Sequence, residues 1–177
     1  MTSAPVEPVP VPRAQGPHGR RLPDAFAGAF SGAMLAGAYA FEFIGGLAPC
    51  QMCHWQRWTH WAVIAAALLA LALPRVAALR WLVAAALGSA VTIAAFHAGV
   101  EYGWWSGPAS CAAGVVDPGE LRAANPLDLF DAPIEVPDCS KPAWTMMGVS
   151  MAGWNALASL GALLLYTWLA RRTGDPA

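Results

Sequence analysis

The sequence predicts an all-α membrane protein, a bundle of four transmembrane helices with a long periplasmic loop between the third and fourth. Of its 177 residues, 57% are hydrophobic and 12% are charged, about half the charged share of a soluble globular domain. The 10 basic and 11 acidic residues leave a formal net charge of -1, so neither nucleic-acid binding nor disorder is favoured. Four long, almost uncharged stretches account for the apolar composition, and each can form a helix that crosses a bilayer.

The first apolar stretch predicts a helix over about 25–47, and the next predicts a second helix over about 54–73. Both are rich in alanine, and small side chains let helix backbones approach closely inside a membrane. Residues 1–24 are rich in proline, so we expect a disordered cytoplasmic tail there. A cleaved signal peptide is the alternative for the first stretch, although this stretch is longer than a usual signal core.

The third helix is predicted over about 79–101 and the fourth over about 142–170, joined by a loop at 102–141. Arginine residues precede the first helix, lie between the second and third, and follow the fourth. The positive-inside rule therefore places both termini in the cytoplasm, including a short tail at 173–177. The first and third connections then face outward, where aromatic residues mark one interface. These are Trp55, Trp58, Trp61, Tyr102, Trp104, Trp105 and Trp144.

All four cysteines lie in these outward connections, where thiols can remain oxidised. Cys50 and Cys53 are separated by two residues at the start of the second helix, a spacing that allows a small, easily reduced disulfide. We favour a redox-active pair over a static cross-link, because so short a ring constrains little chain entropy. The helix N-terminus and Arg57, one turn further on, favour a thiolate at Cys53. Arg57 is alternatively an interfacial arginine that reaches the lipid–water boundary.

The two remaining cysteines, Cys111 and Cys139, are 28 positions apart in the third connection and could close it as a second disulfide. Taken alone, such a disulfide is usually structural. Beside a Cys-x-x-Cys pair at the membrane surface it could instead relay electrons, because thiol–disulfide exchange passes two electrons between cysteine pairs. The spacing leaves both possibilities open.

His54 directly follows Cys53 and completes Cys-x-x-Cys-His, the attachment signal for c-type haem. A membrane-anchored c-type cytochrome is therefore an alternative, although haem would occupy Cys50 and Cys53 and leave the loop cysteines without an electron partner. A non-catalytic membrane scaffold is a second alternative. No metal site is expected, because the loop cysteines lack a second two-residue spacing and His54 and His60 do not share a helical face.

Three blocks of residues around the cysteines form a specific pattern. The first contains Glu42, Gly46-Leu47-Ala48-Pro49-Cys50, Cys53 and Gln56-Arg57; the second runs from His97 to Cys111; the third runs from Cys139 to Asn155. Together they resemble the bacterial disulfide bond formation protein B (DsbB) family, which are quinone-dependent thiol oxidases of the inner membrane. The resemblance covers most of the chain between Glu42 and Asn155 and leaves the two tails uncovered.

This resemblance implies that all four cysteines are catalytic in a disulfide-generating thiol oxidase. Cys111 would be attacked by a reduced, periplasmic DsbA-like partner with a thioredoxin fold. Cys139 would then carry electrons toward Cys50. In the last step Cys53 would deliver the electrons to ubiquinone or menaquinone.

The resemblance also implies a quinone site at the outer end of the bundle. Arg57 would polarise a quinone oxygen as negative charge develops on it. The position of His97 at the outer end of the third helix suggests that it too contacts the quinone; a histidine satisfied at the interface is the alternative. Glu42 is interpreted as an interfacial carboxylate rather than a proton carrier.

Overall fold

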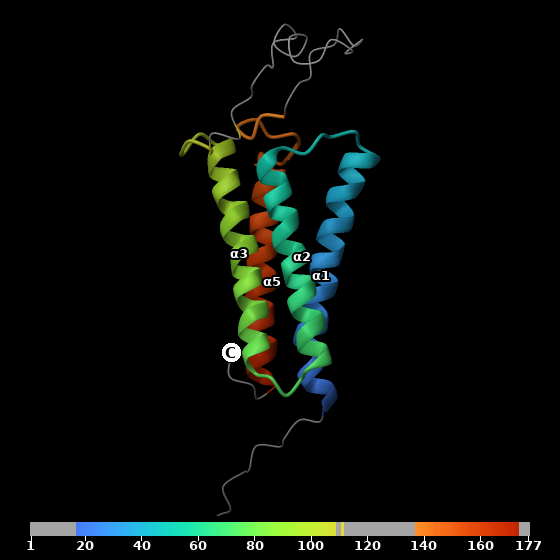
Figure 1. Ribbon diagram of the computed structural model, residues 1–177. Helices are drawn as coiled ribbons and strands as arrows, with labels where there is room; N and C mark the ends of the chain where they lie inside the picture. Colours follow the sequence, from blue (N-terminus) through green and yellow to red (C-terminus); the bar gives the residue numbers. More distant parts are fainter. Residues whose placement is uncertain (1–16, 109–110, 112–136, 174–177) are drawn as a thin grey trace, which may run out of the picture.

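Four long helices form the molecule in the computed structural model, which describes residues 17–108, 111 and 137–173. The helices are α1 (Pro17–Phe43), α2 (Gln51–Ala72), α3 (Ala78–Glu101) and α5 (Met151–Arg172), and a hairpin of β1 (Thr145–Met146) and β2 (Val149–Ser150) precedes α5. The helices run side by side along one common direction, and the described chain begins and ends at the same end of the bundle (Figure 1). A largely helical fold with four long helices is thus confirmed.

The first helix is displaced toward the N-terminus compared with the prediction. It begins at Pro17, so the last part of the expected tail is helical, and proline suits the first position of a helix. It ends at Phe43, before the predicted boundary, because the chain turns at Gly46, whose φ of 69° suits glycine. The rest of the predicted N-terminal tail, 1–16, lies outside the described residues, as do positions 174–177 of the C-terminal tail.

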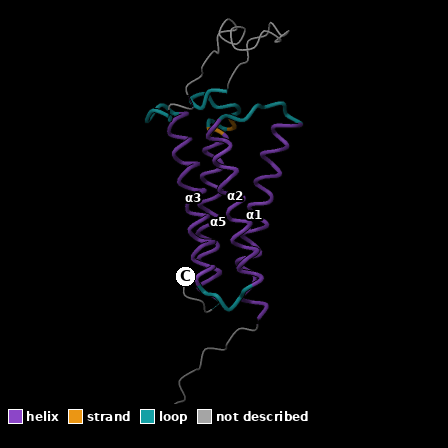
Figure 2. The backbone as a smooth tube through the Cα atoms, in the orientation of Figure 1, coloured by secondary structure: helices purple, strands orange, loops and turns teal. Residues whose placement is uncertain are grey.

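The fourth helix begins later than predicted, at Met151, because an antiparallel hairpin occupies the residues before it (Figure 2). The hairpin turns at Met147 and Gly148, which have φ values of 53° and 78°. Ser150 then ends the second strand and caps the helix, its hydroxyl oxygen accepting a backbone N–H of the first turn over 3.1 Å. The helix start is therefore set by turn and cap residues within a stretch that carries no charge.

Small side chains fill the interior of the bundle, whereas many large apolar ones point outward. The main buried cluster consists of Ala27, Val63, Ala66, Ala67, Ala70, Val83, Leu87, Ala162 and Tyr166. Large exposed side chains include Trp58, Trp61, Leu68, Leu69, Trp81, Leu82, Leu157, Leu164 and Trp168. Short interior side chains allow close approach of the helices, and large apolar groups on the outside suit contact with lipid.

A buried polar cluster joins three helices at the end of the bundle where the described chain begins and ends. The hydroxyl of Tyr166 on α5 lies 3.1 Å from a carboxylate oxygen of Asp24 on α1 and 3.2 Å from the carbonyl oxygen of Arg80 on α3. The side chain of Arg80 approaches the Asp24 carboxylate to 3.6 Å. These contacts fix α1, α3 and α5 relative to one another at the end opposite the cysteines.

Among the described helices, α3 alone is both long and apolar enough to qualify as a membrane span by length and composition. Polar side chains in the first half of α2, including Gln56, Arg57, Thr59 and His60, lower the mean hydropathy of that helix. Gln56, Thr59 and His60 are nonetheless buried against the other helices. Part of the polar content of α2 therefore belongs to the interior of the bundle.

Candidate active site

The Cys-x-x-Cys pair lies at the N-terminal end of α2. Cys50 is the N-cap residue, and its sulfur accepts the backbone N–H of Cys53 over 3.3 Å. The two cysteines are free thiols with their sulfur atoms 2.9 Å apart. Cys50 is buried and Cys53 is half-buried. The pair can therefore close to a disulfide with little movement and is largely sheltered from bulk water.

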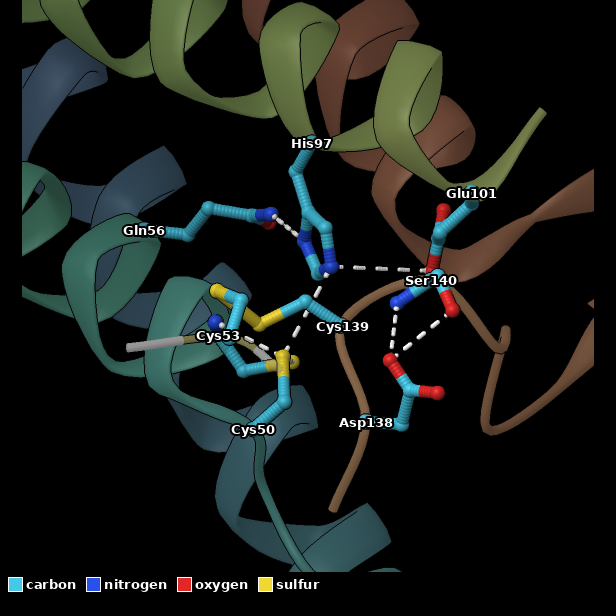
Figure 3. The surroundings of a disulfide bond; sticks show 9 residues. Cys50, Cys53, Gln56, His97, Glu101, Asp138, Cys139 and Ser140 are labelled. Atoms are coloured by element: carbon cyan, nitrogen blue, oxygen red, sulfur yellow. Dashed lines mark hydrogen bonds and ion pairs between the residues drawn. A yellow bond between two sulfur atoms is a disulfide. The ribbon is translucent and has the colours of Figure 1, made fainter. Parts of the chain in front are cut away.

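The loop cysteines form a disulfide that packs directly against this pair. Cys111 and Cys139 have their Cα atoms 5.2 Å apart, and both are buried in one cluster with Cys50. The sulfur atoms of Cys139 and Cys50 and a ring nitrogen of His97 all lie within 4.8 Å of one another (Figure 3). The structure thus brings the four cysteines together, with a disulfide beside a dithiol, as thiol–disulfide exchange requires.

A short turn holds Cys139 in this position. One carboxylate oxygen of Asp138 accepts the backbone N–H of Ser140 over 2.9 Å and its hydroxyl over 2.8 Å. The two hydrogen bonds from Ser140 lower the pKa of Asp138 below its ordinary value, the bond from the backbone N–H having the larger effect. The charged carboxylate therefore stabilises the turn that presents Cys139 to Cys50.

The surroundings of the pair stabilise a thiolate at Cys50, whereas the sequence predicted it at Cys53. The pKa of Cys50 is lowered, first by the hydrogen bond from the Cys53 thiol and further by His97, whose Nε2 lies 3.6 Å from the Cys50 sulfur; burial acts in the opposite direction. As the N-cap residue, Cys50 also accepts a backbone N–H at the positive end of α2. In the dithiol state the geometry therefore favours the thiolate at Cys50 rather than at Cys53. The sequence argument missed this because it considered distance from the helix end and not the direction of the N-cap side chain.

Arg57 is held against α1, one turn into α2. Its guanidinium forms an ion pair with Glu42, donates to the carbonyl oxygen of Ala38 over 3.3 Å and lies 4.8 Å from the centre of the Tyr39 ring. Arg57 also lines the large cavity described below. Glu42 is therefore the counter-ion of the arginine that we predicted to bind quinone.

His97 contacts the redox pair directly. Its Nε2 faces both the sulfur of Cys50, at 3.6 Å, and a carboxylate oxygen of Glu101, at 3.8 Å, while its Nδ1 lies 2.6 Å from the amide nitrogen of Gln56. Glu101 is 4% exposed, and its second carboxylate oxygen has no hydrogen-bond partner among the described residues. The position of His97 therefore gives it contact with a reacting sulfur, beyond the quinone contact that we predicted.

A chain of polar side chains continues from His97 across the bundle, and the sequence analysis assigned it no role. Asn155 of α5 donates to Gln56 over 2.6 Å, and its amide oxygen lies 3.1 Å from Nε2 of His60. Nδ1 of His60 lies 3.3 Å from the hydroxyl of Ser31 on α1. The available signal was the presence of His60 and Asn155 within apolar stretches, since polar groups are costly there and often functional.

A cavity of about 950 Å³ opens beside the cysteines, between α1, α2 and α5. Cys50, Cys53, Arg57 and His97 all contribute to its wall. Most of the remaining wall is apolar and includes Ala33, Met34, Leu35, Phe41, Leu47, Trp144, Met151 and Trp154. A large apolar cavity with a few polar and redox-active groups suits a flat, mostly apolar molecule that carries a small number of polar atoms.

Two other features that the sequence singled out lie differently. His54 lines a separate hollow with Tyr39, Arg57, Trp58 and Trp61, and not the large cavity. Cys50, His97 and Cys139 are close enough to be considered as a metal triad, but the sulfur of Cys139 is in a disulfide and offers no thiolate. In this state the triad is better described as part of the redox site.

Comparison with known proteins identifies the family. The family model of disulfide bond formation protein DsbB matches residues 20–169. Disulfide bond formation protein B of Methylococcus capsulatus is 33% identical over 148 residues, covering 78% of this chain and 88% of the relative. The same protein of a Polaromonas species is 33% identical over 153 residues (79% and 86%), and that of Verminephrobacter eiseniae is 34% identical over 146 residues (75% and 77%). No solved structure is significantly similar to the chain. Because the family match spans all four cysteines and the helices that hold them, the chain belongs to the DsbB family and is a disulfide-generating thiol oxidase.

Proposed function

We propose that this protein is an inner-membrane thiol:quinone oxidoreductase that reoxidises a periplasmic DsbA-like protein and transfers the electrons to ubiquinone or menaquinone. One observation carries the proposal: a disulfide and a dithiol meet in one buried cluster beside a large, mainly apolar cavity. The disulfide supplies the oxidant for a partner's thiols. The cavity gives the Cys50–Cys53 pair access to an acceptor dissolved in lipid.

The proposed route conserves electrons and protons at each step. A partner dithiol attacks Cys111 and breaks the Cys111–Cys139 bond, which leaves the partner as a disulfide and the loop cysteines reduced. The sulfur of Cys139 then attacks Cys50 of the oxidised pair, which forms a Cys50–Cys139 disulfide and releases Cys53 as a thiolate. Cys111 next attacks Cys139, which re-forms the loop disulfide, releases Cys50 and leaves the two electrons on the Cys50–Cys53 pair. Oxidation of this pair by quinone transfers two electrons and two protons, and the products are a disulfide and a quinol.

The wall of the cavity supports a quinone as the acceptor. The guanidinium of Arg57 is a fixed positive charge at the wall, and such a group stabilises the negative charge that develops on a quinone oxygen. The apolar wall formed by α1 and α5 suits the rest of a lipid-soluble quinone. The predicted roles of Arg57 and His97 as quinone-binding residues are therefore retained as part of the proposal.

The dimensions and charges of the bundle support an arrangement in which it spans the membrane. A helix of 22 residues, the length of α2 and of α5, is about 33 Å long at 1.5 Å per residue and can cross a hydrocarbon core of about 30 Å. Arg75 lies in the turn between α2 and α3, and Arg171 and Arg172 lie in the last turn of α5, all at the end opposite the cysteines (Figure 1). These charges support the proposal, by the positive-inside rule, that both termini are cytoplasmic and the cysteines periplasmic.

Purified protein in lipid nanodiscs tests this function directly. With a reduced thioredoxin-fold oxidase and a ubiquinone analogue, we expect loss of the donor's thiols together with loss of the quinone absorbance. Replacing any one of the four cysteines with serine should abolish the coupled reaction, whereas Thr167→Ser at a half-buried site near the opposite end should retain it. Turnover that survives Cys53→Ser would refute the proposed route. A Soret band in the purified protein would instead favour the c-type cytochrome, and full function of all cysteine variants would favour the scaffold.

A further inference from the structure

A hydrogen-bonded chain of side chains links the buried centre of the bundle to the sulfur of Cys50. In order from α1, its members are Ser31, His60, Asn155, Gln56, His97 and Cys50, with successive separations of 3.3, 3.1, 2.6, 2.6 and 3.6 Å. Asn155, Gln56 and His97 lie on α5, α2 and α3, and Figure 3 shows the end of the chain at Gln56, His97 and Cys50. Ser31, His60 and His97 are each at most 3% exposed, so water competes little for these hydrogen bonds.

The amide groups give this chain a direction. Asn155 donates its N–H to the amide oxygen of Gln56, which leaves the amide nitrogen of Gln56 to donate to Nδ1 of His97. A neutral imidazole has one N–H and one acceptor nitrogen, so an acceptor at Nδ1 places the hydrogen on Nε2. The amide oxygen of Asn155 accepts in turn from the hydroxyl of Ser159 over 3.1 Å and faces Nε2 of His60.

The opposite end of the chain selects the same direction. Nε2 of His97 faces the sulfur of Cys50 and the carboxyl group of Glu101, and both groups accept hydrogen bonds when Cys50 and Glu101 are ionised. A hydrogen on Nε2 is attracted by both groups, whereas a lone pair on Nε2 would be repelled by the carboxylate. The reverse orientation of both amides is therefore disfavoured at the sulfur end.

We propose that Gln56, Asn155 and His60 are positioning residues that hold the hydrogen of His97 on Nε2, where it is donated to the sulfur of Cys50. The chain thereby stabilises the thiolate of Cys50 in the reduced enzyme. This inference goes beyond the electron route, because it assigns roles to three residues that need not touch donor, quinone or another cysteine.

The consequence for the reaction concerns the closing of the disulfide. When the pair is oxidised, the quinone takes two electrons from the Cys50 thiolate and the Cys53 thiol, the S–H bond of Cys53 is lost and the Cys50–Cys53 bond forms. The Cys53 proton and one proton from solvent complete the quinol. A thiolate that is already present at neutral pH makes this step faster than a neutral thiol would. Among the described residues, the other titratable groups near Cys50 are Cys53 and, behind His97, Glu101. The sulfur of Cys139 also lies close, but it is held in its disulfide and does not titrate.

Two substitutions interrupt the chain at different points. Asn155→Leu replaces the amide with an apolar side chain that has the same number of heavy atoms and the same branching, and His60→Phe removes the donor to Asn155. In each variant we expect the pH midpoint for rapid iodoacetamide labelling of Cys50, measured by peptide mass spectrometry of the full chain, to rise by about one unit. One pKa unit corresponds to about 1.4 kcal/mol, which is close to the contribution of one hydrogen bond to a charged group. His60→Gln retains a side-chain N–H, so its labelling midpoint should stay close to that of the unaltered protein. Because the labelling experiment contains no quinone, this inference can fail while the proposed electron route stands.

A second readout reports the His97 tautomer itself. Nitrogen-15 NMR of histidine-labelled protein should show a hydrogen on Nε2 of His97 in the unaltered chain and a mixture of tautomers in Asn155→Leu and His60→Phe. Tyr166→Phe is the matched control, since it removes a buried polar group from the same bundle at the far end. The proposal is overturned if the Cys50 midpoint and the His97 tautomer stay unchanged in the variant that folds, or if Tyr166→Phe changes them equally.

Discussion

The contact between the two redox couples predicts that Cys50 and Cys139 form a disulfide when their own partners are removed. Their sulfur atoms lie no more than 4.8 Å apart. A disulfide bond is about 2.05 Å long, so the two atoms need to approach by about 2.8 Å at most. A change of one staggered rotamer at χ1 moves a cysteine sulfur by about 3 Å. The cross-link should therefore form by side-chain rotation, without displacement of α2 or of the turn that holds Cys139.

The assay uses a variant that carries Cys53→Ser and Cys111→Ser. After brief treatment with diamide and digestion, mass spectrometry should show nearly complete linkage of Cys50 to Cys139. The matched variant carries Cys50→Ser and Cys111→Ser, and it should link Cys53 to Cys139 more slowly because the thiolate is the attacking species and is favoured at Cys50. If Cys50 and Cys139 stay unlinked while both react with an alkylating reagent, the contact on which the electron route depends is wrong.

Three further predictions concern the acceptor, the pH dependence and the stability of the bundle. Arg57→Ala should raise the apparent KM for a ubiquinone analogue by roughly ten- to a hundredfold, because hydrogen bonds to charged groups contribute about 1.5–3 kcal/mol. An unchanged KM in steady-state assays would favour the interfacial role of Arg57 instead. Since the pKa of Cys50 is lowered, its thiolate persists below the pKa of an ordinary thiol and is lost only as the pH falls through the lowered value. Labelling of reduced protein should therefore continue well into the acidic range, and a midpoint between about 8 and 9, as for a free thiol, would contradict the stated electrostatics. Tyr166→Phe should lower the free energy of unfolding by about 1 kcal/mol, because Asp24 and the Arg80 carbonyl lose a donor; chemical denaturation in detergent would measure this, and no change would show that the cluster adds little to stability.

The existence of the helices could be predicted from the sequence, but their boundaries could only partly be predicted. Uncharged apolar stretches gave four helices because charged groups are expensive inside a bilayer. The same criterion placed the fourth helix too early, since the residues before Met151 carry no charge but contain the turn at Met147 and Gly148 and the Ser150 cap. A reading of turn residues and caps, and not of charge, would have found that boundary.

The candidate active site was likewise only partly predictable from the sequence. The four cysteines and Arg57 were identified from local spacing and family resemblance, because their patterns lie within short segments. The contact of Cys139 with Cys50 and the chain through His60 and Asn155 depend on how distant segments pack, and no local pattern specifies that packing. The thiolate at Cys50 depends likewise on His97, a residue of another helix.

The central claim is that the Cys50–Cys53 pair transfers its electrons to quinone. The most direct test is to mix fully reduced protein rapidly with one equivalent of a ubiquinone analogue in the absence of oxygen. Samples quenched with an alkylating reagent over time would report which cysteines lose their thiols first, and absorbance would report quinol. We expect Cys50 and Cys53 to be oxidised before Cys111 and Cys139, with one quinol formed for every two thiols lost. Oxidation of the loop pair first, or loss of thiols without quinol, would contradict the account.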